Sequence, residues 1–228
     1  QRVNLGRIRN DVDALWNLAP HDISIIQYWL NEPEPICVKR SGMDYVQKGI
    51  DDVVFLNIKY PDNVLVNIHV SWLDPHKIRK MTIVGSKKMV VYDDIAENKI
   101  AIYDKGIDRM ANLGEHMDFD NSSTFSFNHR SGDVAMPKIK WIEPLKTEIA
   151  HFVDCIKNGT DCITGPSHAA NVVDILEQAL MNYFKAETAI VNNTSIGNGS
   201  KIWHYANVYG CTMGENCTIG AYTEIQND

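Results

Sequence analysis

Long apolar runs and clusters of basic residues are both missing from this chain. No apolar run in its 228 residues approaches the roughly 20 residues that a transmembrane helix needs. Lys and Arg number 22 against 29 Asp and Glu, which gives a net charge of -7, and the basic residues form no block. The sequence therefore predicts no membrane span and no surface for nucleic acid or an anionic membrane.

Cysteine is scarce and its spacing is uninformative. The five cysteines are scattered, odd in number and without a C-x-x-C pair. This usage is typical of free thiols in a reducing cytoplasm, which is where we expect the protein to be located. The eight histidines form neither H-x-x-x-H nor H-E-x-x-H. We therefore predict no metal site.

Motifs that bind a nucleotide or activate a serine are absent as well. The chain has no G-x-G-x-x-G, no phosphate-loop spacing and no G-x-S-x-G. We therefore expect no dinucleotide-binding site within this chain. The sequence opens without Met on apolar alternation and stops inside a repeat at "EIQND". These two features favour a fragment of a larger protein.

Hydrophobic periodicity is present and indicates an α+β fold over residues 1–185. A stripe of Ile25, Ile26, Trp29 and Leu30 predicts a helix over 18–30, which "NEPEP" ends. Alternating apolar residues over 36–140 predict antiparallel hairpins, one of them turning at "YPDN" in a type I turn. Residues 106–135 are expected to form a long loop or an irregular hairpin.

Two further helical stripes follow the predicted strands, one over 145–156 and the other over 172–183. The ending Lys157-Asn158-Gly159 is typical of a helix C-terminus. The fold class is therefore an open antiparallel sheet with helices on one face.

The tail, residues 186–228, changes its period. Apolar residues recur at a spacing near six, with one unit a residue short: Ile196, Ile202, Val208, Met213, Ile219 and Ile225. This period suits a parallel β-helix with one inward residue per side and Gly or Asn in its turns. We predict about two opening coils of a parallel β-helix.

The stretch "LWNLAPHDISI" carries the strongest candidate for chemistry. Pro20 is tolerated only in a first helical turn, which predicts Asn17 as the N-cap and His21 just inside the helix. The positive end of the helix dipole disfavours an imidazolium, so His21 is expected to be neutral and suited to general base work. The alternative is a first-turn histidine that bonds local backbone.

Several motifs occur together in order: "LWNLAPHDISI", "SWLDPHKIRKMTIVGSKKMVVYDD", "IYDKG", and "EPLKTEIAHFVDCIKNG" with "VVDILEQA". Over residues 1–183 they resemble the C-terminal domain of Gfo/Idh/MocA oxidoreductases, in the branch that acts on nucleotide-linked sugars. The resemblance implies an N-terminal Rossmann domain, outside this chain, that binds NAD or NADP and contributes a catalytic lysine.

That resemblance also implies a substrate pocket on this chain. The family's Asp-x-x-x-His pair aligns with Asn17 and His21, so the histidine matches and the aspartate does not. Asn can hold a hydroxyl group but cannot take a proton, so the resemblance moves the acid–base role to His21 and to the catalytic lysine of the N-terminal domain. Arg9 and Trp16 are weaker candidates for substrate binding, on adjacency alone.

The tail, from "AETAIVNNTSIGNGSKIWHYANV" onward, is similar to the opening coils of left-handed parallel β-helix acyltransferases that act on amino-sugar nucleotides, which implies a left-handed β-helix here. This likeness implies a trimer that binds acyl-CoA between neighbouring β-helices, through coils that come later than those in this chain. Together the two resemblances imply a sugar-nucleotide dehydrogenase fused to a sugar N-acyltransferase, and a homo-oligomer formed through the sheet face and the β-helix. The alternatives are a non-catalytic oligomerisation module and a dehydrogenase of free sugars or inositols.

Overall fold

The computed structural model describes residues 1–111, 125–180 and 183–226. The chain divides into two compact units, one formed by 1–8 with 69–163 and the other by 9–68 with 164–228. In the described part of the chain, no helix is both long and apolar enough to cross a membrane.

The first unit is built on antiparallel strands. From one edge, its strands lie in the order β1, β5, β6, β7, β8, and each neighbouring pair is antiparallel. The end of β4 pairs with β1 in parallel, with Arg2 opposite Val70, so the sheet is mixed where antiparallel pairing was predicted throughout. The elements are β1 (Arg2–Val3), β4 (Leu65–Ser71), β5 (Ile78–Val84), β6 (Met89–Asp93), β7 (Ile100–Ala111), β8 (Phe125–Ala135) and α2 (Pro144–Asn158).

The two described ends of the segment 106–135 pair with each other, as the irregular hairpin among the two predicted alternatives requires. Strands β7 and β8 pair from Ile102 with Ala135 to Ala111 with Phe125, with a register shift between Tyr103 and Lys105. The connection between the two strands, including His116, lies outside the described residues. The described parts of the segment, 106–111 and 125–135, are therefore paired strands.

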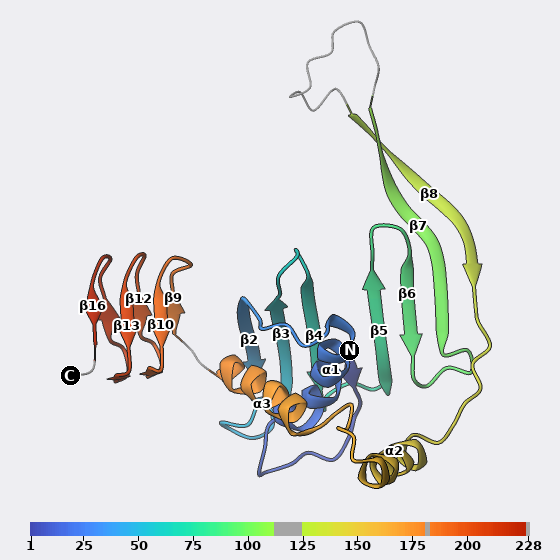
Figure 1. The fold of residues 1–228 in the computed structure, drawn as a ribbon, viewed down its shortest axis with the longest axis horizontal. Coiled ribbons are helices and arrows are strands. Elements are labelled where there is room, and N and C mark those ends of the chain that lie inside the picture. The colour runs from blue at the N-terminus through green and yellow to red at the C-terminus, as the bar shows by residue number, and fades with distance from the viewer. Residues whose placement is uncertain (112–124, 181–182, 227–228) are drawn as a thin grey trace, which may run out of the picture. The chain divides into compact units, whose positions relative to one another are not determined.

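The second unit packs two helices on one face of its strands. Helices α1 and α3 lie side by side against β2 and β3 (Figure 1). Alternate residues Val54, Leu56 and Ile58 of β3 have no exposed surface, whereas Phe55 between them is 43% exposed. This alternation is what a sheet covered on one face requires. The elements are α1 (Ala14–Leu30), β2 (Cys37–Met43), β3 (Val53–Lys59) and α3 (Pro166–Leu180).

The turn between β3 and β4 differs from the predicted type I turn. The backbone N–H of Val64 donates to the carbonyl of Pro61 at 3.3 Å, so Asp62 and Asn63 are the central residues. Both have positive φ, 58° and 59°. Positive φ at both central positions is the mark of a type I′ turn, whose twist matches that of a hairpin. The hairpin was predicted correctly and its turn type was wrong, because Pro61 precedes the central pair.

The tail forms the first coils of a parallel β-helix. Successive coils pair in parallel with an offset of 17 residues, as in Ile190 with Asn207 and Ile202 with Ile219. The predicted repeat unit that is one residue shorter than six occurs at the same place in both coils. It runs from Val191 to Ile196 in one coil and from Val208 to Met213 in the next. The strands are β9 (Phe184–Lys185), β10 (Ile190–Asn192), β11 (Ser195–Ile196), β12 (Lys201–Ile202), β13 (Asn207–Tyr209), β14 (Thr212–Met213), β15 (Thr218–Ile219) and β16 (Glu224–Ile225).

The six apolar residues that defined the repeat all pack into the interior of the coils, as predicted. Positive φ recurs at the turns, at Asn193 and Gly210 and at Gly199 and Asn216. One turn position lacks the predicted Gly or Asn, because Tyr205 and Tyr222 occupy it, also with positive φ of 61° and 60°. Their rings stack, with centroids 5.0 Å apart.

Candidate functional site

Helix α1 begins earlier than the sequence predicted. Asp13 is its N-cap, and the carboxylate accepts a hydrogen bond from the backbone N–H of Trp16 at 2.9 Å. The backbone N–H of Asn17 donates to the carbonyl of Asp13, as in an ordinary helical turn. Asn17 is therefore not the N-cap. An aspartate four residues upstream took that position, because it caps as well as asparagine does.

Pro20 consequently lies inside α1 rather than in its first turn. It leaves the carbonyl of Trp16 without the helical hydrogen bond that position 20 would otherwise donate. His21 stands in the third helical turn, where the helix dipole no longer acts strongly. The dipole therefore gives no reason for a neutral His21. The prediction that His21 lies in the first helical turn was wrong.

The buried face of α1 also differs from the predicted stripe. Ala14, Leu15, Ala19, Asp22, Ile23 and Gln27 are the buried residues of the helix. Trp29, by contrast, is 46% exposed. Gln27 is accommodated in the core because its side-chain amide donates to the Tyr60 hydroxyl at 3.0 Å. Burial raises the pKa of Tyr60, while the hydrogen bond from Gln27 acts in the opposite direction.

Asn17 and His21 lie one helical turn apart on α1. A spacing of four residues places their side chains on the same face of a helix. Asn17 is half-buried and His21 is exposed. An amide and an imidazole on one partly open helix face can hold a polar ligand, the first by hydrogen bonding and the second also by proton transfer.

Trp16 and Arg9 have different positions. Trp16 is half-buried and directly precedes Asn17 on α1. Arg9 is exposed and lies before the helix, where its guanidinium pairs with Asp11 at 2.8 and 2.5 Å. The hydrogen bond from Arg9 holds the pKa of Asp11 below its usual range. In the described contacts, the Arg9 side chain thus pairs with Asp11, two residues away, rather than with Asn17 or His21.

Charged contacts anchor the N-terminus of α1 to the strands. Arg40 of β2 donates to Asp13 at 2.8 Å and also pairs with Asp51. The backbone N–H of Ala14 donates to the carbonyl of Asp51 at 2.9 Å. These half-buried groups hold the first turn of the helix, and so the position of Asn17, against the sheet.

Sequence reasoning missed a second polar group, which joins α1 to α3. His168 is 5% exposed, and its Nδ1 lies 2.6 Å from Glu32 Oε1 while its Nε2 lies 2.7 Å from Ser24 Oγ. A serine, a histidine and a glutamate linked by hydrogen bonds with the histidine in the middle also make up a hydrolytic triad. Ser24, however, lies within a helix whose backbone N–H groups are already used, so they cannot form an oxyanion hole. We therefore assign this group to fastening the helices together.

The structure also brings together a group of three side chains that could bind a metal ion, His151, Cys155 and Cys162. No sequence spacing marked these residues, because the nearest pair is histidine and cysteine rather than two cysteines or two histidines. All five cysteines lie in described residues and are free.

Family models match two separate parts of the chain. Residues 7–91 match the model of the GFO/IDH/MocA C-terminal domain, and this segment contains Asn17 and His21. Residues 193–227 match the model described as bacterial transferase hexapeptide (six repeats). These two segments, 7–91 and 193–227, thus resemble a Gfo/Idh/MocA C-terminal domain and hexapeptide repeats, respectively. A search among curated proteins returned no match.

Solved oxidoreductase structures share the fold. UDP-N-acetylglucosamine 3-dehydrogenase GnnA from Acidithiobacillus ferrooxidans gives a TM-score of 0.57 at 18% identity, covering 78% of this chain and 50% of GnnA. GenD2 from gentamicin A biosynthesis, in complex with NAD, gives 0.55 at 16% identity, covering 78% and 50%. Aldose-aldose oxidoreductase from Caulobacter crescentus gives 0.52 at 13% identity, covering 77% and 48%. The chain spans about half the length of these proteins.

Proposed function

We propose that this chain is the substrate-side part of an NAD(P)-dependent oxidoreductase that oxidises a ring hydroxyl of a nucleotide-linked sugar. The observation that carries the proposal is the pair Asn17 and His21, one turn apart on a helix that lies within the matched 7–91 segment. The substrate class is suggested by GnnA, which acts on UDP-N-acetylglucosamine. Its nucleotide-linked substrate and the free cysteines suit a cytoplasmic enzyme.

In this proposal His21 orients the reacting hydroxyl group or relays its proton. Asn17 holds a neighbouring hydroxyl, since its amide can donate and accept hydrogen bonds but cannot take up a proton. Trp16 is a weaker candidate, because residues adjacent in a helix do not share a face. Arg9 contributes only if it is released from Asp11. The anchored start of α1 keeps Asn17 in place, as substrate positioning requires.

The residues of this chain do not fit a dinucleotide. A Gly-rich turn between a strand and a helix is needed to bring the backbone close to a pyrophosphate, and the sequence has no G-x-G-x-x-G. We therefore propose that NAD or NADP is bound by another domain of the same protein. When bound, the nicotinamide accepts the hydride.

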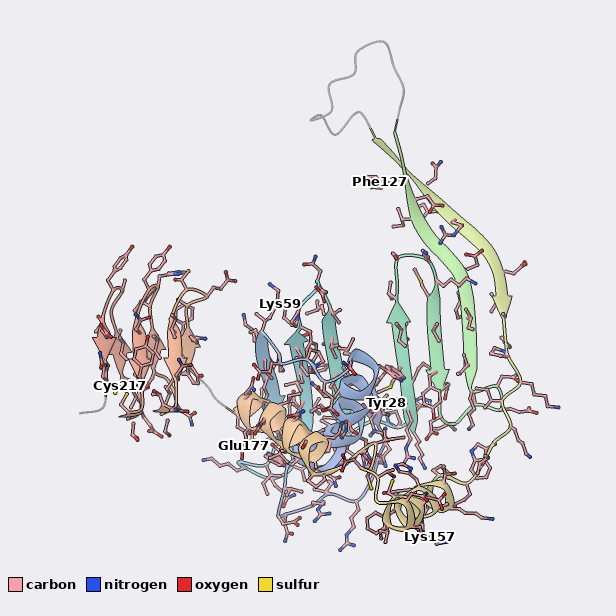
Figure 2. All side chains as sticks on the ribbon, in the orientation of Figure 1. Tyr28, Lys59, Phe127, Lys157, Glu177 and Cys217 are labelled. Atoms are coloured by element: carbon pink, nitrogen blue, oxygen red, sulfur yellow. The ribbon has the colours of Figure 1, made fainter. Side chains whose placement is uncertain are left out.

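The hexapeptide repeats support a second part of the proposal. We infer that they begin a sugar N-acyltransferase, with residues 1–185 and 186–228 as separate domains and acyl-CoA as its donor. Such a fusion would oxidise a sugar and later acylate it after an amination by another enzyme. Apolar side chains exposed on the strands, such as Phe127 at 68% (Figure 2), support a homo-oligomer through the sheet face.

The test uses the product of the complete gene with a panel of UDP-sugars, read as NAD or NADP reduction. We expect His21→Ala to lower kcat/KM by about 100-fold or more, the usual contribution of a positioned acid–base group. His76→Ala, at an exposed turn, is the matched control and should be unaffected. Unchanged turnover in His21→Ala would refute the assigned role. The 228-residue chain alone should reduce no cofactor.

A non-catalytic oligomerisation module is the second candidate, and Asn17 in place of the family's aspartate favours it. The variant Asn17→Asp separates the two functions. A gain of turnover in the complete protein would support a tuned enzyme. Absence of turnover from both forms, with the oligomer intact, would support the module.

A further inference from the structure

The last two turns of α2 and the segment that follows them face each other. The helix ends at Asn158, and Gly159 adopts the left-handed conformation with φ of 63°, which reverses the chain. The backbone N–H of Thr160 then donates to the carbonyl of Cys155 at 3.1 Å. Further on, the N–H of Ile163 donates to Nε2 of His151 at 3.1 Å. The returning segment is thus held along the helix.

This return places a second thiol beside a histidine and cysteine pair. His151 and Cys155 are four residues apart on α2 and therefore share a face. Cys162 comes from the returning segment, and the ligand atoms of all three residues lie within 4.8 Å of one another. Cys155 is buried, whereas His151 and Cys162 are half-buried, so the group can be reached from solvent.

We propose that His151, Cys155 and Cys162 bind a Zn²⁺ ion. The distances suit tetrahedral zinc, in which a sulfur and a nitrogen ligand lie about 3.6 Å apart and two sulfurs about 3.8 Å apart. Cys155 Sγ lies 3.6 Å from Nε2 and 3.8 Å from Nδ1 of His151. Thiolate and imidazole are the donors that select zinc over magnesium or calcium.

The described residues supply three ligands, which leaves the fourth position to water or to an external donor. Binding has a local consequence, because neutral imidazole has a single lone pair on its ring nitrogens. If Nε2 binds the metal, Ile163 N–H must give up its present acceptor. Each thiol releases its proton as it becomes a ligand. The ion would then replace a hydrogen bond as the link between α2 and the returning segment.

The experiment titrates the reduced chain with Co²⁺, whose thiolate charge-transfer absorption reports sulfur ligation, and then displaces it with Zn²⁺. We expect one ion per chain. Cys162→Ser and His151→Gln should each weaken binding by more than about 100-fold, because even changes outside the ligand shell cost 10–100-fold. Glutamine can still accept the Ile163 N–H, so His151→Gln tests ligation rather than folding.

Cys217→Ser is the control. This cysteine is also half-buried but lies in the parallel coils (Figure 2), and its loss should leave Co²⁺ binding unchanged. Circular dichroism checks that each variant folds. Three results would overturn the proposal: no cobalt uptake by the reduced chain, unchanged uptake in Cys162→Ser, or an equal loss in Cys217→Ser. Because the readout is metal binding by this chain, its failure is independent of any dehydrogenase activity.

Discussion

Arg40 donates a hydrogen bond to Asp13 at 2.8 Å, and Asp13 caps the helix that carries Asn17 and His21. The Asp13 carboxylate thus accepts a hydrogen bond from a backbone N–H in the first turn of the helix. It also pairs with a strand residue 27 positions away. The candidate site therefore depends on a residue that would not itself touch a ligand.

Replacing Asp13 tests this dependence. Asp13→Ala removes the cap and the ion pair, so we expect the free energy of unfolding to fall by about 1–2 kcal/mol. Asp13→Asn keeps the capping oxygen and should lose less. Asn17→Ala should cost less than half as much as Asp13→Ala, because Asn17 is not the cap. Urea denaturation measures all three. A larger loss in Asn17→Ala than in Asp13→Ala would contradict the helix start seen here.

Asp93 gives the protein a specific response to acid. It accepts hydrogen bonds from the N–H groups of Ile95 at 3.1 Å and Ala96 at 3.3 Å, and it pairs with Lys80 at 3.2 Å. Burial acts to raise the pKa of Asp93, but these three contacts together hold it below its usual range. Asp93 therefore binds a proton less readily in the folded state than in the unfolded chain.

It follows that Asp93 contributes stability above the pKa of an unfolded aspartate, about 3.9, and that this contribution is lost as the pH falls through the lower folded-state value. Asp93→Asn should lower the urea midpoint at pH 7, and the difference from wild type should shrink below about pH 4. The exposed Glu97→Gln is the control. A difference that stays constant from pH 7 to pH 3 would rule out this linkage.

Gly197 and Gly214 occupy the same position in successive coils but differ in their surroundings. A Cβ atom at Gly197 would lie 2.5 Å from the carbonyl carbon of Gly214, whereas one at Gly214 meets nothing closer than the Cys217 sulfur at 3.8 Å. Gly197→Ala should therefore destabilise the coils by about 1–3 kcal/mol. Within the 228-residue chain, where no further coil stacks on Gly214, Gly214→Ala should be neutral or stabilise slightly, since alanine restricts the unfolded chain. Thermal unfolding and limited proteolysis compare the two, and equal effects would refute the close approach of the coils.

Local periodicity predicted the elements well and their boundaries poorly. The β3–β4 hairpin, the end of α2 at Gly159 and the inward residues of the coils follow from alternation, capping chemistry and a repeat. The start of α1 does not, because Asp13 and Asn17 are both good caps, and tertiary contacts such as the Arg40 ion pair favour Asp13. The buried face of α1 was misjudged for a related reason. The side-chain amide of buried Gln27 finds a hydrogen-bond partner in Tyr60, which is distant in the sequence.

The sequence by itself determined the α+β class, the parallel coils and the spacing of Asn17 from His21, since each depends on residues close in the chain. Tertiary structure alone decided which polar groups meet. His168 reaches Glu32 across 136 residues. Cys162 joins His151 because Gly159 reverses the chain, a direction that no residue pattern specifies. Side-chain periodicity describes one element at a time, whereas a site forms where separate elements pack.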